Sequence, residues 1–347
     1  MKQVYLKNVL LAAGLLLGMG ASAQDFTVDN INYNVTSEAD MTCEVAETSG
    51  LTGDVAIPEQ VTADGKTYTV TAIGDMALSG PGNQFTSVKL PSTVTAIGYG
   101  AFYQCRNLTS IDLGGSVETI GYSAFQYCES LSSIELPNTL TSIGEVAFMG
   151  SGLTSVVIPE SVTTVEMGAF SACGLMKSAV VNCAVTSQSM FLVCSDLEEV
   201  TIGGGVTSIA SSMFQSCPNL KTVTMLGATP PSIGDYAFYD VPLENATLRV
   251  PEGTLSAYQG AQTWKDFGTI VEYTPTGISN VEAGSGFTVK AADGVITVEG
   301  AEGEVSVYDM SGAKVAAVKA DGSATIAVPA RGAYIVKVGG KAVKVAM

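Results

Sequence analysis

One short segment recurs in tandem along this chain at a nearly constant interval, and a repeat of this kind constrains the fold more than any other feature. Successive copies begin at Ile97, Ile120 and Ile143, and the next begins at Val165 after an interval that is shorter by one position. The first three read IGYGAFYQCRNLTSIDLGGSVET, IGYSAFQYCESLSSIELPNTLTS and IGEVAFMGSGLTSVVIPESVTT. Degraded or partial copies begin at Ile73, Ser187, Ile209 and Ile233.

Each copy follows IGxxAFxxCxxLxxIxLPxxVxx, which combines two local patterns. The LxxIxLP half, as in residues 131–137, predicts a short strand that ends at a proline. The IGxxAFxxC half predicts a tight turn at the glycine and then roughly one helical turn that buries Ala124 and Phe125. One copy cannot hide its apolar residues, but stacked copies share a continuous core. We therefore expect a mainly β solenoid of 23-residue repeats with short helical turns. One interior column should contain Phe102, Phe125, Phe148 and Phe170.

The 347 residues include no histidine, which excludes several kinds of site. Ser-His-Asp catalysis, Cys-His catalysis and HExxH zinc chemistry all need an imidazole. The formal net charge is −17, from 16 basic and 33 acidic residues. We expect no nucleic acid partner, because phosphate binding calls for a basic face. The sequence indicates no metal and no cofactor.

The start of the chain, residues 1–23, predicts an export signal. Lys2 and Lys7 form a basic start, residues 9–20 are apolar, and residues 21–23 form an Ala-Ser-Ala cleavage site. Cleavage after Ala23 removes two lysines and takes the net charge from −17 to −19. The apolar run is shorter than the ~20 residues of a membrane-spanning helix, so no transmembrane segment is expected after cleavage. We therefore predict a secreted or cell-surface protein.

The segments around the repeats predict two caps and a further domain. Residues 24–72 alternate apolar and polar positions, as expected of a β cap on the first repeat. Residues 73–273 contain the repeats and a C-terminal cap, in which a helix bearing Tyr258 and Trp264 should cover the last apolar surface. The period is lost after Gly277, and seven short strands follow. Residues 278–347 therefore predict a small β-sandwich.

Five of the 7 cysteines occupy the same repeat position: Cys105, Cys128, Cys173, Cys194 and Cys217. Equivalent Cβ atoms on stacked strands lie ~4.8 Å apart, whereas a disulfide prefers ~3.8 Å. These cysteines should therefore form a buried ladder of free thiols, with Ser151 taking the position in one copy. Cys43 and Cys183 lie outside the ladder, and their redox state stays open.

The exposed strand positions form the candidate ligand-binding surface. Its residues are Lys89, Ser110, Asp112, Ser133, Glu135, Lys177, Glu199 and Thr201. Asp112 and Glu135 should lie one strand apart, with ~4.8 Å between their Cα atoms. That spacing fits a carboxylate pair of a carbohydrate-cleaving site, but Val157 follows in the next repeat and no aromatic residue shares these strand positions. Solvated side chains that only keep the strands soluble are the alternative interpretation.

The repeat resembles that of the BspA-like bacterial leucine-rich-repeat proteins, over about residues 73–238. This resemblance implies a leucine-rich-repeat solenoid in a surface or secreted protein implicated in adhesion and protein binding. VSVYDMSGAKV, from Val305, and ARGAYIVKVGGKAVKV, from Ala330, resemble the C-terminal (Por) sorting domain of the type IX secretion system of Bacteroidetes. That implies an export domain often removed in transit, although the final basic residue common in that family is missing here. An accessory domain that displays the repeats is the alternative.

These features favour a non-enzymatic adhesion protein that binds an extracellular protein or glycan. One alternative is a solenoid enzyme that acts on carbohydrate. The other is a passive element of the cell surface without a ligand. The sequence does not identify the ligand or the oligomeric state.

Overall fold

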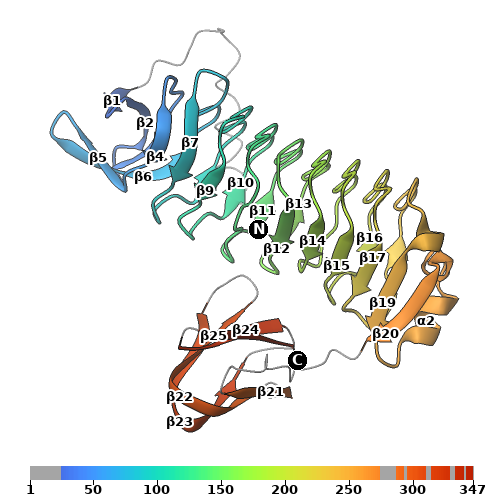
Figure 1. Ribbon diagram of the computed structural model, residues 1–347. Helices are drawn as coiled ribbons and strands as arrows, with labels where there is room; N and C mark the ends of the chain where they lie inside the picture. Colours follow the sequence, from blue (N-terminus) through green and yellow to red (C-terminus); the bar gives the residue numbers. More distant parts are fainter. Residues whose placement is uncertain are drawn as a thin grey trace.

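A computed structural model of the chain describes residues 25–273, 287–292, 295–309, 314–328, 333–339 and 341–346. Residues 25–273 form a mainly β solenoid of about 10 turns, and its coils stack in chain order (Figure 1). The predicted repeat fold is therefore confirmed. The export signal predicted for residues 1–23 and its cleavage site lie outside the described residues, as does the predicted start of the second domain at residue 278. Within the described ranges, no helix is long and apolar enough to cross a membrane.

Six strands form the N-terminal end: β1 (Phe26–Val28), β2 (Ile31–Ser37), β3 (Thr42–Val45), β4 (Thr52–Ala56), β5 (Gln60–Ala63) and β6 (Lys66–Ile73). β1 and β2 pair antiparallel, as do β2 and β3. β3 then pairs in parallel with β6, and β4 pairs in parallel with β7 (Gln84–Lys89). Parallel stacking of coils thus begins inside the segment that we expected to act only as a cap.

A ladder of two-residue strands marks the start of most repeats: β8 (Ala96–Ile97), β10 (Thr119–Ile120), β11 (Ser142–Ile143) and β13 (Thr164–Val165), then β16 (Ser208–Ile209) with β18 (Ser232–Ile233). The glycine that follows packs directly on the backbone of the previous coil. A Cβ at Gly144 would lie 2.6 Å from the carbonyl carbon of Gly121. Glycine at this position therefore permits close approach of the coils in five copies, and Glu166, Ser187 and Ala210 take the position in the other three.

Longer strands form the opposite side of each coil in two parallel sheets. One contains β4, β7 and β9 (Ser110–Asp112), and the other contains β12 (Ser155–Ile158), β14 (Ser178–Val181), β15 (Glu199–Ile202), β17 (Thr222–Met225), β19 (Thr247–Pro251) and β20 (Thr269–Tyr273). Between the two sheets, residues 131–137 form no strand, contrary to the prediction. In the preceding repeat, Gly114 takes the place of this proline and has a φ of 70°.

The IGxxAFxxC half of each repeat is a series of tight turns, where the sequence predicted about one helical turn. Two residues per coil have positive φ, such as Ser123 (54°) and Tyr127 (60°). Because a helix needs negative φ at every residue, these two positions interrupt it. The turns instead direct amides toward the next coil. The amides of Gly100, Phe102 and Gln104 donate to the carbonyls of Tyr122, Ala124 and Gln126 at 2.8, 2.8 and 2.9 Å.

The repeated phenylalanines form the single interior column that the sequence predicted. The Phe102 and Phe125 rings stack at 5.0 Å, Phe125 and Phe148 at 5.2 Å, and Phe148 and Phe170 at 5.0 Å, each pair within 5° of parallel. The column continues through Phe191 and Phe214 to Phe238. All of these rings are buried. One hydrophobic core therefore runs the length of the solenoid.

The cysteine ladder is present, and hydrogen bonds explain it. Each thiol donates to the carbonyl oxygen of the phenylalanine position one coil earlier: Cys128 to Phe102 at 3.1 Å, and Cys173 to Phe148 at 3.2 Å. All seven cysteines of the chain, including Cys43 and Cys183, are buried free thiols. The repeat thus selects a small buried donor at this position, because an unpaired buried carbonyl would be costly. Ser151 also carries a hydroxyl there, and it is hydrogen-bonded to the Cys173 thiol at 3.3 Å.

Short helices and aromatic rings close the C-terminal end of the solenoid. These helices are η1 (Leu243–Asn245), α2 (Leu255–Gly260) and η2 (Trp264–Asp266). Trp264 packs edge-on against Phe238, the last ring of the column, and its indole donates to the carbonyl of Pro231 at 2.8 Å. The Tyr258 hydroxyl donates to the carbonyl of Gly227 at 2.7 Å. These buried aromatic side chains cover the end of the core.

The C-terminal residues form one curled antiparallel sheet with its own core. Its strands are β21 (Thr288–Ala292), β22 (Val295–Asp309), β23 (Lys314–Ala327), β24 (Ala333–Val338) and β25 (Lys341–Ala346). Two pairs of predicted short strands merge into β22 and β23, because Gly300 and Gly322 take positive φ and let each strand continue. The sheet curls so that β21 also contacts β25. It thereby encloses a core made mainly of valine, isoleucine and alanine, with Phe287 and Tyr334.

Phe148→Ala should lower the free energy of unfolding by about 3–5 kcal/mol, because it opens a cavity between two stacked neighbours. Urea unfolding followed by circular dichroism measures this change. The control is Ser155→Ala, an exposed change in the same repeat, which should alter stability by less than about 0.5 kcal/mol. If Phe148→Ala lowered the free energy of unfolding by less than about 1 kcal/mol, the stacked rings would not be a main source of stability.

The buried thiols should make the solenoid unstable in alkali. Burial raises the pKa of Cys105 and of Cys217 to about 12. Because a thiol in the unfolded chain ionises at lower pH, the unfolded state loses protons first as the pH rises. The free energy of unfolding should therefore be unaffected below about pH 8 and fall above it by about 1.4 kcal/mol per pH unit for each such thiol.

Urea unfolding across that alkaline range provides the measurement. Cys217→Ser removes one titrating thiol and keeps a donor that Ser151 shows to be compatible with the ladder. Its stability should fall less steeply with pH than that of the parent chain. Equal slopes for the two proteins would show that the thiols do not set the alkaline limit.

Candidate binding surface on the strand face

We use the term strand face for the outward side chains of the parallel strands β7, β9, β12, β14, β15, β17, β19 and β20. Their register places equivalent residues in rows that run from coil to coil. Ser110 pairs with Ser87, and further along the same row Ser178 lies between Ser155 and Glu199. The row continues through Thr222, Thr247 and Thr269. Most of its members carry a hydroxyl group.

A second row lies two residues further along each strand. Lys89 pairs with Asp112 on the neighbouring strand, and the two charged groups approach to 3.9 Å. Across the larger sheet, Val157, Val180, Thr201, Thr224 and Arg249 are paired in turn. Thr201 is half-buried, so this row forms a low, even surface.

The eight predicted residues therefore do not form one cluster. Ser110, Ser133 and Glu199 occupy the first row position, and Lys89, Asp112, Glu135 and Thr201 occupy the second. Lys177 lies outside both rows, because it is in the segment that precedes β14. Sequence spacing had placed Lys177 beside the carboxylates of the strand, and the register separates them.

Asp112 and Glu135 do come together, at the break between the two sheets. Both line a hollow of about 320 Å³, together with Ile111, Leu113, Gly114, Gly115 and Pro137. One Asp112 carboxylate oxygen accepts the amide of Gly114 at 3.0 Å. A Cβ at Gly114 would lie 2.7 Å from the carbonyl oxygens of Leu90 and Pro91, so glycine is needed for this turn.

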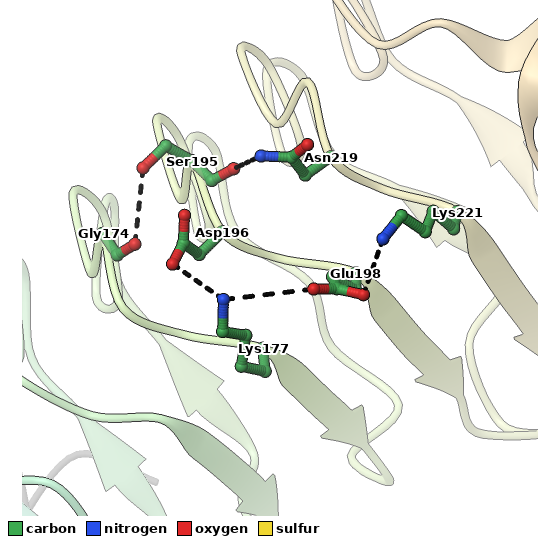
Figure 2. Close-up of polar contacts among 7 residues, drawn as sticks. All are labelled: Gly174, Lys177, Ser195, Asp196, Glu198, Asn219 and Lys221. Carbon is green, nitrogen blue, oxygen red and sulfur yellow. Dashed lines mark hydrogen bonds and ion pairs between the residues drawn. The ribbon is translucent and has the colours of Figure 1, made fainter.

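A line of ion pairs borders the strand face where the chain approaches β14, β15 and β17 (Figure 2). The Lys177 ammonium lies 2.8 Å from Asp196 and 3.9 Å from Glu198. Glu198 also contacts Lys221 at 2.8 Å. Side-chain hydrogen bonds also link neighbouring coils beside these ion pairs. The side-chain amide of Asn219, for example, donates to the carbonyl of Ser195 at 2.9 Å.

These pairs change the titration of their members in the expected directions. The hydrogen bond from Lys221 lowers the pKa of Glu198, and the hydrogen bond to Asp196 raises the pKa of Lys177. All four side chains are at least one-third exposed, so water and salt screen them. Sequence analysis missed Asp196, Glu198 and Lys221, although one signal was available: charged residues precede three successive strands.

The arrangement suits hydrogen bonding over an extended area more than chemistry at one point. Hydroxyl groups recur at every coil, and charged groups lie at the border and at the break. Among the residues that the structure describes, no group of three or more cysteine, aspartate or glutamate side chains could hold a metal ion.

Comparison with known proteins identifies the repeat. The model of the BspA type leucine rich repeat region matches in 6 copies, over residues 66–177 and 118–244. Together these ranges run from residue 66 to residue 244, which is more than half of the chain. No curated protein matches the chain.

Several solved structures are similar. A leucine-rich repeat protein from Bacteroides ovatus is 24% identical over 71% of this chain and 88% of its own length, with a TM-score of 0.41. The leucine rich repeat protein of T. pallidum is 28% identical over 63% of this chain and 91% of its own, with a TM-score of 0.47. The pneumococcal vaccine antigen PcpA is 15% identical over 72% of this chain and 98% of its own, with a TM-score of 0.37. On the match to the repeat model, this chain belongs to the family of BspA-type leucine-rich repeat proteins.

Proposed function

We propose that this chain is an exported binding protein whose strand face recognises an extracellular protein or glycan. Proteins with BspA-type leucine-rich repeats are typically found at the cell surface, which supports the location. The export signal in residues 1–23, its removal after Ala23 and a sorting role for the C-terminal sheet are parts of the same proposal. A sorting domain must fold by itself to be recognised, and the separate core of β21–β25 is consistent with that requirement.

One observation carries the binding role: the two outward rows continue without interruption across the six strands from β12 to β20. Adjacent parallel strands lie ~4.8 Å apart. The first row therefore offers hydroxyl groups at every position except Glu199, over more than ~20 Å. An extended polymer can contact several of them at once, and many weak contacts then add up to useful affinity.

Binding accounts for this surface better than catalysis does. The carboxylates of Asp112 and Glu135 share a hollow, which is the specific feature that a carbohydrate-cleaving enzyme would use. However, Asp112 is held by Gly114 and Lys89, and no aromatic residue is among those that line the hollow. We therefore infer a role for these two residues in contacting a ligand at the end of the sheet.

A bulky side chain at the centre of the strand face should block binding. We expect the purified protein to bind saturably to at least one member of a panel of glycans and extracellular proteins. Thr201→Tyr should then weaken that binding at least about tenfold, because the ring covers its neighbours in the row and prevents close contact. Surface plasmon resonance measures both affinities.

The matched control is Gln188→Tyr, which adds the same ring on the turn side, at the repeat position where Tyr99 and Tyr122 occur naturally. It should bind as the parent chain does. The proposal fails if nothing in the panel binds saturably, or if Thr201→Tyr retains full affinity.

A further inference from the structure

A second surface of the solenoid differs from the strand face in composition. We call it the turn face: the six positions between the repeat glycine and the cysteine position, such as residues 99–104. In eight successive copies from residue 75 to residue 240, none of these positions is lysine or arginine. Four carry carboxylates: Asp75, Glu145, Asp235 and Asp240. The turn face therefore carries no positive charge, and its negative charges lie in three of the eight copies.

The six cations of residues 73–273 lie elsewhere, and all except Lys265 in the C-terminal cap are already engaged. Lys89, Arg106, Lys177 and Lys221 each contact a carboxylate on or beside the strand face, and Arg249 lies over the ring of Tyr273. By contrast, no salt bridge within the described residues reaches the four turn-face carboxylates. Their charge is available to a partner.

Tyrosines add a second feature in the first two full repeats. The rings of Tyr99 and Tyr122 stack at 5.5 Å and are 49% and 44% exposed. Tyr103 and Tyr127 form a further pair beside them, at 6.2 Å. Exposed tyrosines at this density are typical of interaction surfaces, because each ring adds much contact area and loses little entropy on binding.

A carboxylate flanks the stacked tyrosine pair on each side. Asp75 and Glu145 occupy the same repeat position as Tyr99 and Tyr122, one coil before and one coil after them. Asp75 is fixed by the amide of Tyr99, which donates to it at 2.8 Å. Because neighbouring coils lie ~4.8 Å apart, a cation on the outer face of Tyr122 would also reach Glu145. Guanidinium groups favour this combination, since they stack on aromatic rings and pair with carboxylates.

We propose that the turn face around Tyr99 and Tyr122 binds an arginine-rich protein segment. This site is distinct from the strand face and does not depend on its proposed function. The net charge of −17 disfavours nucleic acid, an anionic membrane or a second copy of this chain, and it attracts a basic partner. A sugar ring is a weaker candidate, because two rings that stack on each other each keep only one free face.

The test uses a labelled poly-arginine peptide and the purified protein, with affinity measured by fluorescence anisotropy near physiological salt. Tyr99→Ser combined with Tyr122→Ser should weaken binding about fivefold to thirtyfold, as expected for the loss of two exposed cation–π contacts. Glu145→Gln should also weaken binding severalfold. Thermal melting confirms that each variant is folded.

The matched control is Glu59→Gln, which makes the same charge change at an exposed position outside both the strand face and the turn face and should leave affinity nearly unchanged. Equal weakening by Glu145→Gln and Glu59→Gln would overturn the proposal, because binding would then follow net charge alone. Full affinity of the double tyrosine variant would also overturn it, as would glycan binding that the tyrosines support in place of peptide binding. If the double variant does not fold, the two glutamate variants decide the question.

Discussion

The spacing between coils is the constraint on which the rest of this structure depends. Interior rings stack at 5.0 to 5.8 Å from Phe102 to Phe214, while the backbone amides of each turn donate to the next coil at 2.7 to 3.0 Å. Both interactions need the same separation, so any coil that changes its pitch loses them together. Glycines such as Gly144 permit that separation, because a Cβ there would meet the backbone of the coil before it. A single repeat is unstable alone, and it folds because it packs against the neighbouring coils.

The features that could be predicted from the sequence are those fixed by buried side chains at constant intervals. The phenylalanine column and the cysteine ladder follow from period and hydrophobicity, since each apolar position has a partner one repeat further along the chain. The paired positive φ values in the turns could not be predicted. Those positions are occupied by residues as different as Ser123, Val146 and Tyr236, whose own preferences do not favour the left-handed region. The ladder of hydrogen bonds between coils imposes that conformation against local propensity.

The candidate site shows the same division. The sequence correctly indicated that Asp112 and Glu135 lie close together, because they occupy one repeat position in adjacent copies. The sequence did not show that the sheet breaks between them. Residues 131–137 keep the full LxxIxLP pattern that predicts a strand, and they differ from the strand-forming repeats only in the repeat beside them. The repeat pattern aligns Lys177 with Thr109, one residue before the strand, and the prediction overlooked this offset. Register is a property of paired strands, and one repeat alone does not specify it.

The coil spacing also shapes the surface. Any side chain at a fixed repeat position lies next to its equivalent in the next copy, so residues on the outside interact in columns as residues in the core do. Tyr99 stacks on Tyr122 for the same reason that Phe102 stacks on Phe125. Lysines of the strand side meet carboxylates one coil away, which neutralises them locally, whereas the turn side has carboxylates without neighbouring lysines. A solenoid of this kind can therefore acquire two surfaces of different chemistry by substitutions at different repeat positions, while the shared core and the hydrogen-bond ladders stay unchanged.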